Sequence, residues 1–265
     1  MAYLPGSLTL SRDAWGMARQ LSGVESQHPL LHVPFVPLED DEGRRTADNA
    51  LNELNATWAA HGRQISKDFV AVLRLLASPA REVHGWIGLH NRAEIAVVSA
   101  TDGDELSVSV AADAVRIYLD PIAPERLVDS VIELMPKYPA SSVRSISVPK
   151  DAYQAATSSG AKRQAATPGR FLVSGQQPTG PGRDVGAMQA LLADRRRGGG
   201  RFYVAARDRM GRRHKSEKPL TYLDLESGRV VFREQHNSGG EPWLVATPAT
   251  PSSIAADLKA LFNEF

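Results

Sequence analysis

The same pattern of prolines and apolar residues occurs twice in this chain, 127 residues apart. In each copy two prolines stand three residues apart, and the second proline opens a run with apolar residues at helical spacing. The matching pairs are Pro121 and Pro248, Pro124 and Pro251, Leu127 and Ile254, Val131 and Leu258, Leu134 and Leu261, and Met135 and Phe262. Fixed proline spacing with a shared helical phase indicates an internal duplication. The period is too long for a solenoid or propeller repeat.

Each copy of this pattern follows residues typical of antiparallel strands. In the first copy, four short segments are rich in β-branched residues and are either alternating or continuously apolar: 83–90, 93–100, 105–112 and 114–119. Residues typical of hairpin turns stand between segments at Asn91–Arg92 and Asp102–Gly103. In the second, 222–225 and 229–235 predict a hairpin around Ser227–Gly228, and 243–246 predicts the next strand. We therefore expect one domain over residues 1–265, built from halves of about 1–136 and 137–265. The expected class is α+β with a central antiparallel sheet.

The N-terminal third is predicted to be mainly helical. Ser11 is a candidate N-cap, and apolar residues recur at helical spacing over 47–58 and 65–76. The short break between these two runs predicts a helical hairpin.

Composition excludes several classes of protein. With no cysteine, the chain has no disulfide framework, no thiolate nucleophile and no cysteine-ligated metal. With 31 basic and 30 acidic residues, the net charge is close to zero, so no overall electrostatic potential favours binding to nucleic acid or to an anionic membrane. No segment is apolar enough to insert into a bilayer, and the first residues lack the pattern of a secretion signal. We expect a cytoplasmic location.

A basic stretch from Arg207 to Lys218 interrupts the second half where the first half has the turn at Asn91–Arg92. Three interpretations remain open: a solvated hairpin tip, an arm that binds a protein partner, or a nucleic-acid contact. The last is the weakest, because aromatic residues are few and no recognition helix or RNA-binding motif is present. The arm interpretation places Arg209, Arg212 and Arg213 at a partner surface.

No motif for catalysis, cofactor binding or metal binding is present. His28 and His32 are four residues apart, but Pro29 and Pro34 oppose the helix that would bring both to one face. The acidic run 39–42 precedes a predicted helix, where carboxylates cap free amides. We therefore expect no catalytic residue, no cofactor and no metal, and thus no enzyme.

Several segments resemble one family of proteins. The run Gly200–Arg213, the segment Pro219–Asp224 and the closing helix Pro248–Phe265 are similar to the EspG family of ESX (type VII) secretion-associated proteins of mycobacteria and their relatives. The resemblance extends to the Trp15 and Gly85–Trp86 segments, and it is weak over 150–183. It implies a pseudo-two-fold fold with helical bundles. It also implies a cytosolic chaperone that binds a PE–PPE heterodimer through the helical tip of the PPE protein and keeps it soluble before export.

A chaperone of this kind needs a broad surface with an apolar centre and a polar rim, and one face of an antiparallel sheet can supply it. By strand alternation, the faces that carry polar residues are expected to be open. The expected partner surface then comprises Val97, Ser99, Ser107, Ser109, Arg229, Val231, Arg233, and Lys259 and Asn263 of the last helix.

The alternative function is a small-molecule-binding or enzymatic domain with a pocket between the halves. Self-association through free sheet edges is a further possibility.

Overall fold

The computed structural model describes residues 4–35, 40–88, 93–163 and 181–265. The chain divides into two compact units. Unit 1 comprises Met1–Pro136, Gly200–Pro219 and Pro251–Phe265, and unit 2 comprises Lys137–Gly199 and Leu220–Thr250. Each unit is described by itself.

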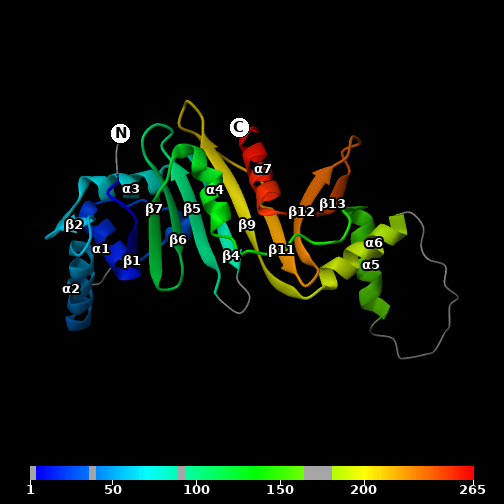
Figure 1. Cartoon of the computed structure of the whole chain (residues 1–265), viewed down its shortest axis with the longest axis horizontal. Coiled ribbons are helices and arrows are strands. Elements are labelled where there is room, and N and C mark those ends of the chain that lie inside the picture. Colours follow the sequence, from blue (N-terminus) through cyan, green and yellow to red (C-terminus); the bar gives the residue numbers. More distant parts are fainter. Residues whose placement is uncertain (1–3, 36–39, 89–92, 164–180) are drawn as a thin grey trace. The chain divides into compact units, whose positions relative to one another are not determined.

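Unit 1 combines a sheet with helices, and its strands follow the order β1-β7-β6-β5-β4-β9 (Figure 1). The short β10 pairs with β9 beside this path, and β2 and β3 form a small hairpin of their own. The strands are β1 (Leu8–Ser11), β2 (Ala60–His61), β3 (Gln64–Ile65), β4 (Arg81–Gly88), β5 (Ile95–Thr101), β6 (Ser107–Ala112), β7 (Arg116–Pro121), β9 (Arg196–Arg207, shared with unit 2) and β10 (Arg213–Lys215). The helices are α1 (Arg12–Ser22), η1 (Pro29–Leu31), α2 (Asp41–Asn55), α3 (Lys67–Ala77), η2 (Pro124–Arg126), α4 (Leu127–Glu133) and α7 (Pro251–Phe262).

The N-terminal helices begin where the sequence supplies a capping side chain. Ser11 accepts a hydrogen bond from the backbone N–H of Ala14, Asp40 from Gly43 and Ser66 from Phe69. The predicted helical break after 58 contains the β2–β3 hairpin, so α2 ends at Asn55, before Trp58. The apolar sides of α1, α2 and α3 pack with one face of β5, β6 and β7 in a single core.

The predicted antiparallel meander is present as β4 to β7. Neighbouring strands pair antiparallel in register, for example Val83 with Ser99 and Ser99 with Ser109. Asp102 holds the turn between β5 and β6, because its Oδ1 accepts three backbone N–H bonds, from residues 104, 105 and 106. The predicted turn at Asn91–Arg92 lies outside the described residues.

The second face of this sheet is covered by a helix. α4 packs on β4, β5 and β6, and α7 packs against α4 (Figure 1). The Oγ atoms of Ser99 on β5 and Ser130 on α4 lie 2.9 Å apart in a buried hydrogen bond. The central strands of unit 1 are thus buried on both faces.

Unit 2 has strands in the order β11-β12-β13-β8. Its core joins apolar residues of α6 with those of β8, β11, β12 and β13. Its strands are β8 (Ile146–Pro149), β11 (Leu220–Leu225), β12 (Gly228–His236) and β13 (Pro242–Pro248), and its helices are α5 (Lys150–Arg163) and α6 (Pro181–Ala193).

Both copies of the proline pattern adopt the same local structure. Pro121 and Pro248 each end a strand, and Pro124 and Pro251 each open a helical segment. The compact units cut across the sequence halves, because α7 belongs to unit 1 whereas the preceding strand β13 belongs to unit 2. The α+β class with antiparallel strands is confirmed, while the duplication and the boundaries 1–136 and 137–265 stay predictions. None of the described helices is long and apolar enough to span a bilayer.

A methyl group at Gly85 is expected to destabilise unit 1. A Cβ at this position would overlap the carbonyl oxygen of Arg201 on β9 and come within 2.9 Å of its carbonyl carbon, so backbone would have to move. We expect Gly85→Ala to lower the free energy of unfolding by roughly 3 kcal/mol, at the upper end of overpacking costs. Urea denaturation monitored by tryptophan fluorescence measures this change.

Gly62→Ala is the control. Gly62 has a φ of 62° with open space around it, so an alanine there would meet no neighbouring atom and would be strained only by the left-handed backbone. Its expected cost is about 1 kcal/mol. Equal costs for the two substitutions would contradict the close approach of β4 and β9.

Candidate partner-binding surfaces

The sheet face expected to be open in unit 1 is closed. The four side chains predicted there are all buried, with exposed fractions of 0% for Val97 and Ser99, 4% for Ser107 and 6% for Ser109. α4 covers this face, and the hydroxyls are used internally: Ser99 contacts Ser130, and Ser107 donates to Thr101 Oγ1 at 2.7 Å. The expectation of an open polar face is therefore wrong, because short hydroxyl side chains can pair beneath a packed helix.

The predicted face of β12 is also mostly internal. Arg229 has no exposed surface, and its guanidinium donates from Nε to Asp224 Oδ1 at 2.6 Å and from Nη2 to Oδ2 at 2.9 Å. Tyr222 packs against the same guanidinium, 4.8 Å from ring centre to Arg229 Cζ, and burial raises the pKa of the Tyr222 hydroxyl. Val231 is buried as well. Only Arg233 of this predicted face is partly exposed.

The basic stretch forms an ordered hairpin tip between β9 and β10. Asp208 holds the turn, because its Oδ1 accepts from the backbone N–H groups of Met210 and Arg212, both at 2.9 Å, and its Oδ2 lies 2.9 Å from His214 Nε2. The hydrogen bond with His214 and those from the backbone lower the pKa of Asp208. Gly211 takes the left-handed conformation that completes the turn, with a φ of 78°.

The arginines of the tip divide into two groups. Arg213 and Arg207 bond within unit 1: the Nε of the partly exposed Arg213 side chain donates to Oε1 of the buried Glu82 at 3.0 Å, and Arg207 donates to the carbonyl of Gly211 at 2.8 Å. Arg209 and Arg212 are exposed, and the side chain between them, Met210, is 93% exposed. All three arginines predicted at a partner surface have exposed surface, and Arg213 is in addition paired with the buried Glu82.

On α7, the two predicted positions are at the surface. Lys259 is exposed and forms an ion pair with Asp129 of α4, 2.9 Å from Nζ to Oδ1, and Asn263 is exposed near the end of the helix.

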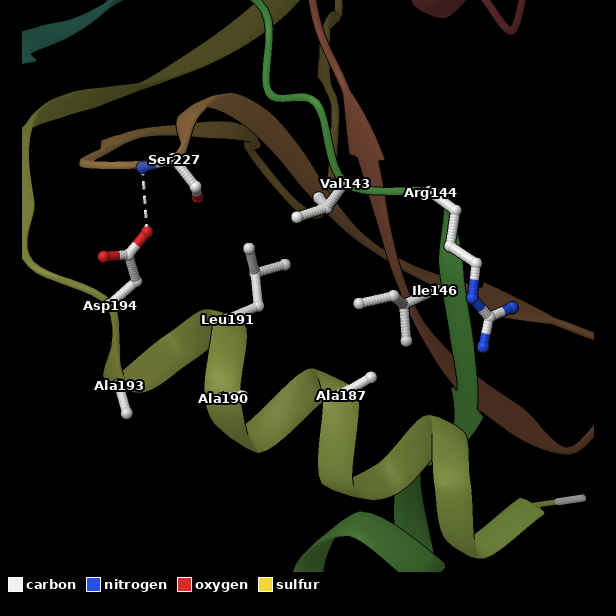
Figure 2. A pocket seen from close by; sticks show the side chains of 9 residues that line it. All are labelled: Val143, Arg144, Ile146, Ala187, Ala190, Leu191, Ala193, Asp194 and Ser227. Atoms are coloured by element: carbon white, nitrogen blue, oxygen red, sulfur yellow. Dashed lines mark hydrogen bonds between the residues drawn. The ribbon is translucent and has the colours of Figure 1, made fainter. Parts of the chain in front are cut away.

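Unit 2 contains an apolar groove of about 560 Å³ that the sequence did not indicate (Figure 2). One side of α6 forms its wall, with small residues at helical spacing that leave room beside the helix. Leu191, Val143 and Ile146 point toward one another across the groove, while Arg144 stands at its edge. The lining residues are Val143, Arg144, Ile146, Ala187, Ala190, Leu191, Ala193, Asp194 and Ser227.

The charged groups at the groove have partners within unit 2. Arg144 forms an ion pair with Asp184, and Asp194 Oδ2 accepts from the backbone N–H of Ser227 at 2.9 Å (Figure 2). The bonds from Ser227 lower the pKa of Asp194. The groove therefore presents an apolar surface with paired charges at its rim, which suits an apolar side chain of a partner rather than a reacting substrate.

The comparison with protein families decides the identity of the chain. The model of the EspG family matches residues 11–260. The chain belongs to the EspG family. A solved structure of the type VII secretion system chaperone EspG5 from Mycobacterium tuberculosis, in complex with the PE25–PPE41 dimer, is similar to this EspG-family chain at 18% sequence identity. The similarity covers 96% of this chain and 94% of EspG5, with a TM-score of 0.63. Among curated proteins, none matches.

This EspG-family chain also contains a buried polar cluster that the sequence analysis missed. His28, Glu82 and His84 meet beneath the surface of unit 1. Burial favours the protonated form of Glu82, but the interactions with His28, His84 and Arg213 outweigh it and hold the pKa of Glu82 at about 2. Burial lowers the pKa of His84 to about 4. Glu82 and His84 are two residues apart on a predicted strand and so share one face of it, which was the sequence feature that pointed to this cluster.

Loss of the carboxylate beneath Arg229 is expected to destabilise unit 2. Asp224→Asn leaves a buried guanidinium without its counter-charge, so we expect a loss of about 3 to 5 kcal/mol in the free energy of unfolding. Chemical denaturation followed by far-UV circular dichroism measures it.

Asp129→Asn serves as the matched control, because its partner Lys259 is exposed and the expected cost is below about 1 kcal/mol. A loss for Asp224→Asn no larger than the control would show that Arg229 is not held internally.

Proposed function

We propose that this protein is a cytoplasmic chaperone that binds a PE–PPE heterodimer and keeps it soluble for type VII secretion, without catalysing a reaction. The observation that carries the proposal is the EspG-family match across residues 11–260, almost the whole chain. The similar EspG5 is a chaperone in complex with a PE–PPE dimer, PE25–PPE41.

The groove beside α6 is the surface best suited to the tip of a helical partner. Ala187, Ala190 and Leu191 lie on one side of α6, and Ala190 is exposed at the groove. A helical bundle that ends in apolar side chains buries them efficiently in such a groove, because apolar burial contributes roughly 25 cal/mol per Å² removed from water. The satisfied rim leaves no buried charge unpaired.

The tip between β9 and β10 suits a second contact. Asp208 fixes its backbone, so the exposed side chains of Arg209, Met210 and Arg212 are held on an ordered turn. An ordered tip loses little conformational entropy on binding. An apolar side chain between two cations is complementary to a partner segment that carries acidic residues around an apolar one.

The alternative of a small-molecule-binding or enzymatic domain has weaker support. The charged lining residues of the groove, Arg144 and Asp194, already have partners, so among its lining residues the hydroxyl of Ser227 is the buried polar group left for a ligand. A ligand pocket normally combines an apolar lining with a few such groups. We therefore retain the chaperone function.

A charge placed in the groove is expected to weaken partner binding. Ala190→Glu puts a carboxylate where the proposed partner buries apolar surface, and desolvating that carboxylate opposes binding. We expect at least about 10-fold weaker affinity, equivalent to about 1.4 kcal/mol. Isothermal titration calorimetry with a purified PE–PPE pair encoded in the same genome measures the affinity.

Asn49→Glu is the matched control, because it adds the same charge at an exposed position of α2, a helix that contributes no residue to the lining of the groove. Its affinity should equal that of the unsubstituted chain. Equal affinity for Ala190→Glu would remove the groove from the partner surface, and no binding by the unsubstituted chain to any folded PE–PPE pair would contradict the chaperone function.

The two exposed arginines of the tip are expected to contribute through charge. The double substitution Arg209→Ser and Arg212→Ser should weaken partner binding by about 3- to 10-fold at low salt, with a smaller difference at high salt because surface charges are screened. Calorimetry at two salt concentrations measures both effects. Unchanged affinity at low salt would make the tip a solvated hairpin without a role in binding.

A further inference from the structure

Three residues that can ligate a metal ion meet in the interior of unit 1. His28 comes from the segment before η1, whereas Glu82 and His84 lie two residues apart on β4 and so share one face of the strand. All three are buried, with exposed fractions of 5%, 1% and 5% for His28, Glu82 and His84. One potential ligand atom of each lies within 4.8 Å of those of the other two.

Each of these residues has one buried polar atom without a hydrogen-bond partner. These atoms are His28 Nε2, Glu82 Oε2 and His84 Nδ1. His28 Nε2 and Glu82 Oε2 are 3.2 Å apart, within the distance of an ion pair. Buried polar atoms almost always have a partner, so three adjacent orphans on ligating side chains point to a missing bound group.

One of the three ligand pairs already has the spacing that a small divalent cation needs, and the three atoms lie within 4.8 Å of one another. Zinc bonds to imidazole nitrogen and carboxylate oxygen measure about 2.0–2.2 Å, so neighbouring ligands of a tetrahedral ion lie roughly 3.3–3.5 Å apart. The distance of 3.2 Å from His28 Nε2 to Glu82 Oε2 is close to that value. Two imidazoles and one carboxylate are a ligand set that zinc uses with a fourth position left for water.

We propose that His28 Nε2, Glu82 Oε2 and His84 Nδ1 form a binding site for one divalent transition-metal ion of the zinc type. The ion would link the segment before η1 to β4 and so hold the N-terminal part of unit 1 against the sheet. This function is separate from partner binding, and it does not rest on the chaperone proposal.

The second oxygen of Glu82 is already oriented by its surroundings. Arg213 donates from Nε to Glu82 Oε1 at 3.0 Å, which leaves Oε2 for the ion. Hydrogen bonds of this kind to a ligating carboxylate are common around metal sites. The positive charge of Arg213 opposes the ion, and that of Lys215, which lies over the ring of Tyr203, acts in the same direction. Moderate affinity is expected as a result.

Metal binding requires one rearrangement at His28. Its Nδ1 accepts a hydrogen bond from the backbone N–H of Leu30 at 3.2 Å, so the neutral ring carries its proton on Nε2. To ligate through Nε2, the ring transfers this proton to Nδ1 and gives up the long contact with Leu30. The exchange moves one proton within the ring and leaves the charge of His28 unchanged.

The test uses the full chain after treatment with a chelator and desalting. Addition of Zn²⁺ should load one ion per chain, measured by elemental analysis after a second desalting step, and should raise the midpoint of thermal unfolding. Co²⁺ in place of Zn²⁺ should give the intense visible absorption of a four-coordinate ion, which exposed histidines do not produce.

Variants then locate the site. Glu82→Gln and His84→Gln should each weaken Zn²⁺ binding at least 10-fold, measured by competition with a chromophoric chelator. His32→Gln is the matched control, since His32 is an exposed histidine four residues from His28, and it should bind Zn²⁺ like the unsubstituted chain.

Two results would overturn the proposal. The first is an unsubstituted chain that retains no Zn²⁺ and shows no shift in its unfolding midpoint. The second is binding that His32→Gln abolishes or that Glu82→Gln and His84→Gln leave unchanged. Near-UV circular dichroism establishes that each variant is folded, and the measurements on the unsubstituted chain decide the question if a variant is not.

Discussion

The burial of β5 and β6 on both faces is the constraint on which the arrangement of unit 1 depends. One face packs against the core formed by α1, α2 and α3, and the other lies under α4. A strand buried on both sides exposes neither face to a partner, so any binding surface must lie elsewhere. The groove beside α6 and the tip at Arg209–Arg212 are candidate positions outside β5 and β6.

Some charged side chains of this fold form ion pairs with buried carboxylates. Arg229 pairs with Asp224 without any exposed surface, and Arg213 reaches from the basic tip to the buried Glu82. Buried pairs of this kind rarely add stability relative to apolar packing, but the loss of one partner is costly. They therefore fix where β12 and the tip lie. Some basic side chains of residues 207–218 thus hold the fold together, and others are exposed to solvent.

Local elements were well predicted from the sequence, because the signals for them are local. Alternation identified the strands of the meander, and the second proline of each pair located the start of a helical segment, namely η2, just before α4, and α7. Alternation also identified which residues of β5 share a face. Alternation does not say whether a helix covers that face. The polar residues Ser99 and Ser109 suggested a face exposed to solvent, whereas the structure has α4 there. The cover is a long-range contact, and nothing near Ser99 in the sequence encodes it.

The candidate sites show the same limit. The groove requires α6 to lie beside residues 143–146, and the cluster requires His28 to meet a strand more than fifty residues later. His28 and His32 are neighbours along the chain and do not form the cluster, whereas Glu82 and His84 already share one face of a strand. A strand pair of ligating residues was therefore a better signal than histidine spacing in a proline-rich segment.

Hydrogen–deuterium exchange of the chain, alone and with a purified PE–PPE pair, shows whether the partner covers α6 and the tip or another surface. The account predicts slower exchange in α6 and in the tip at 208–212 when the pair is bound, with no change in β5 and β6, which are already buried. Slower exchange confined to other surfaces, or none with every folded pair, would contradict it.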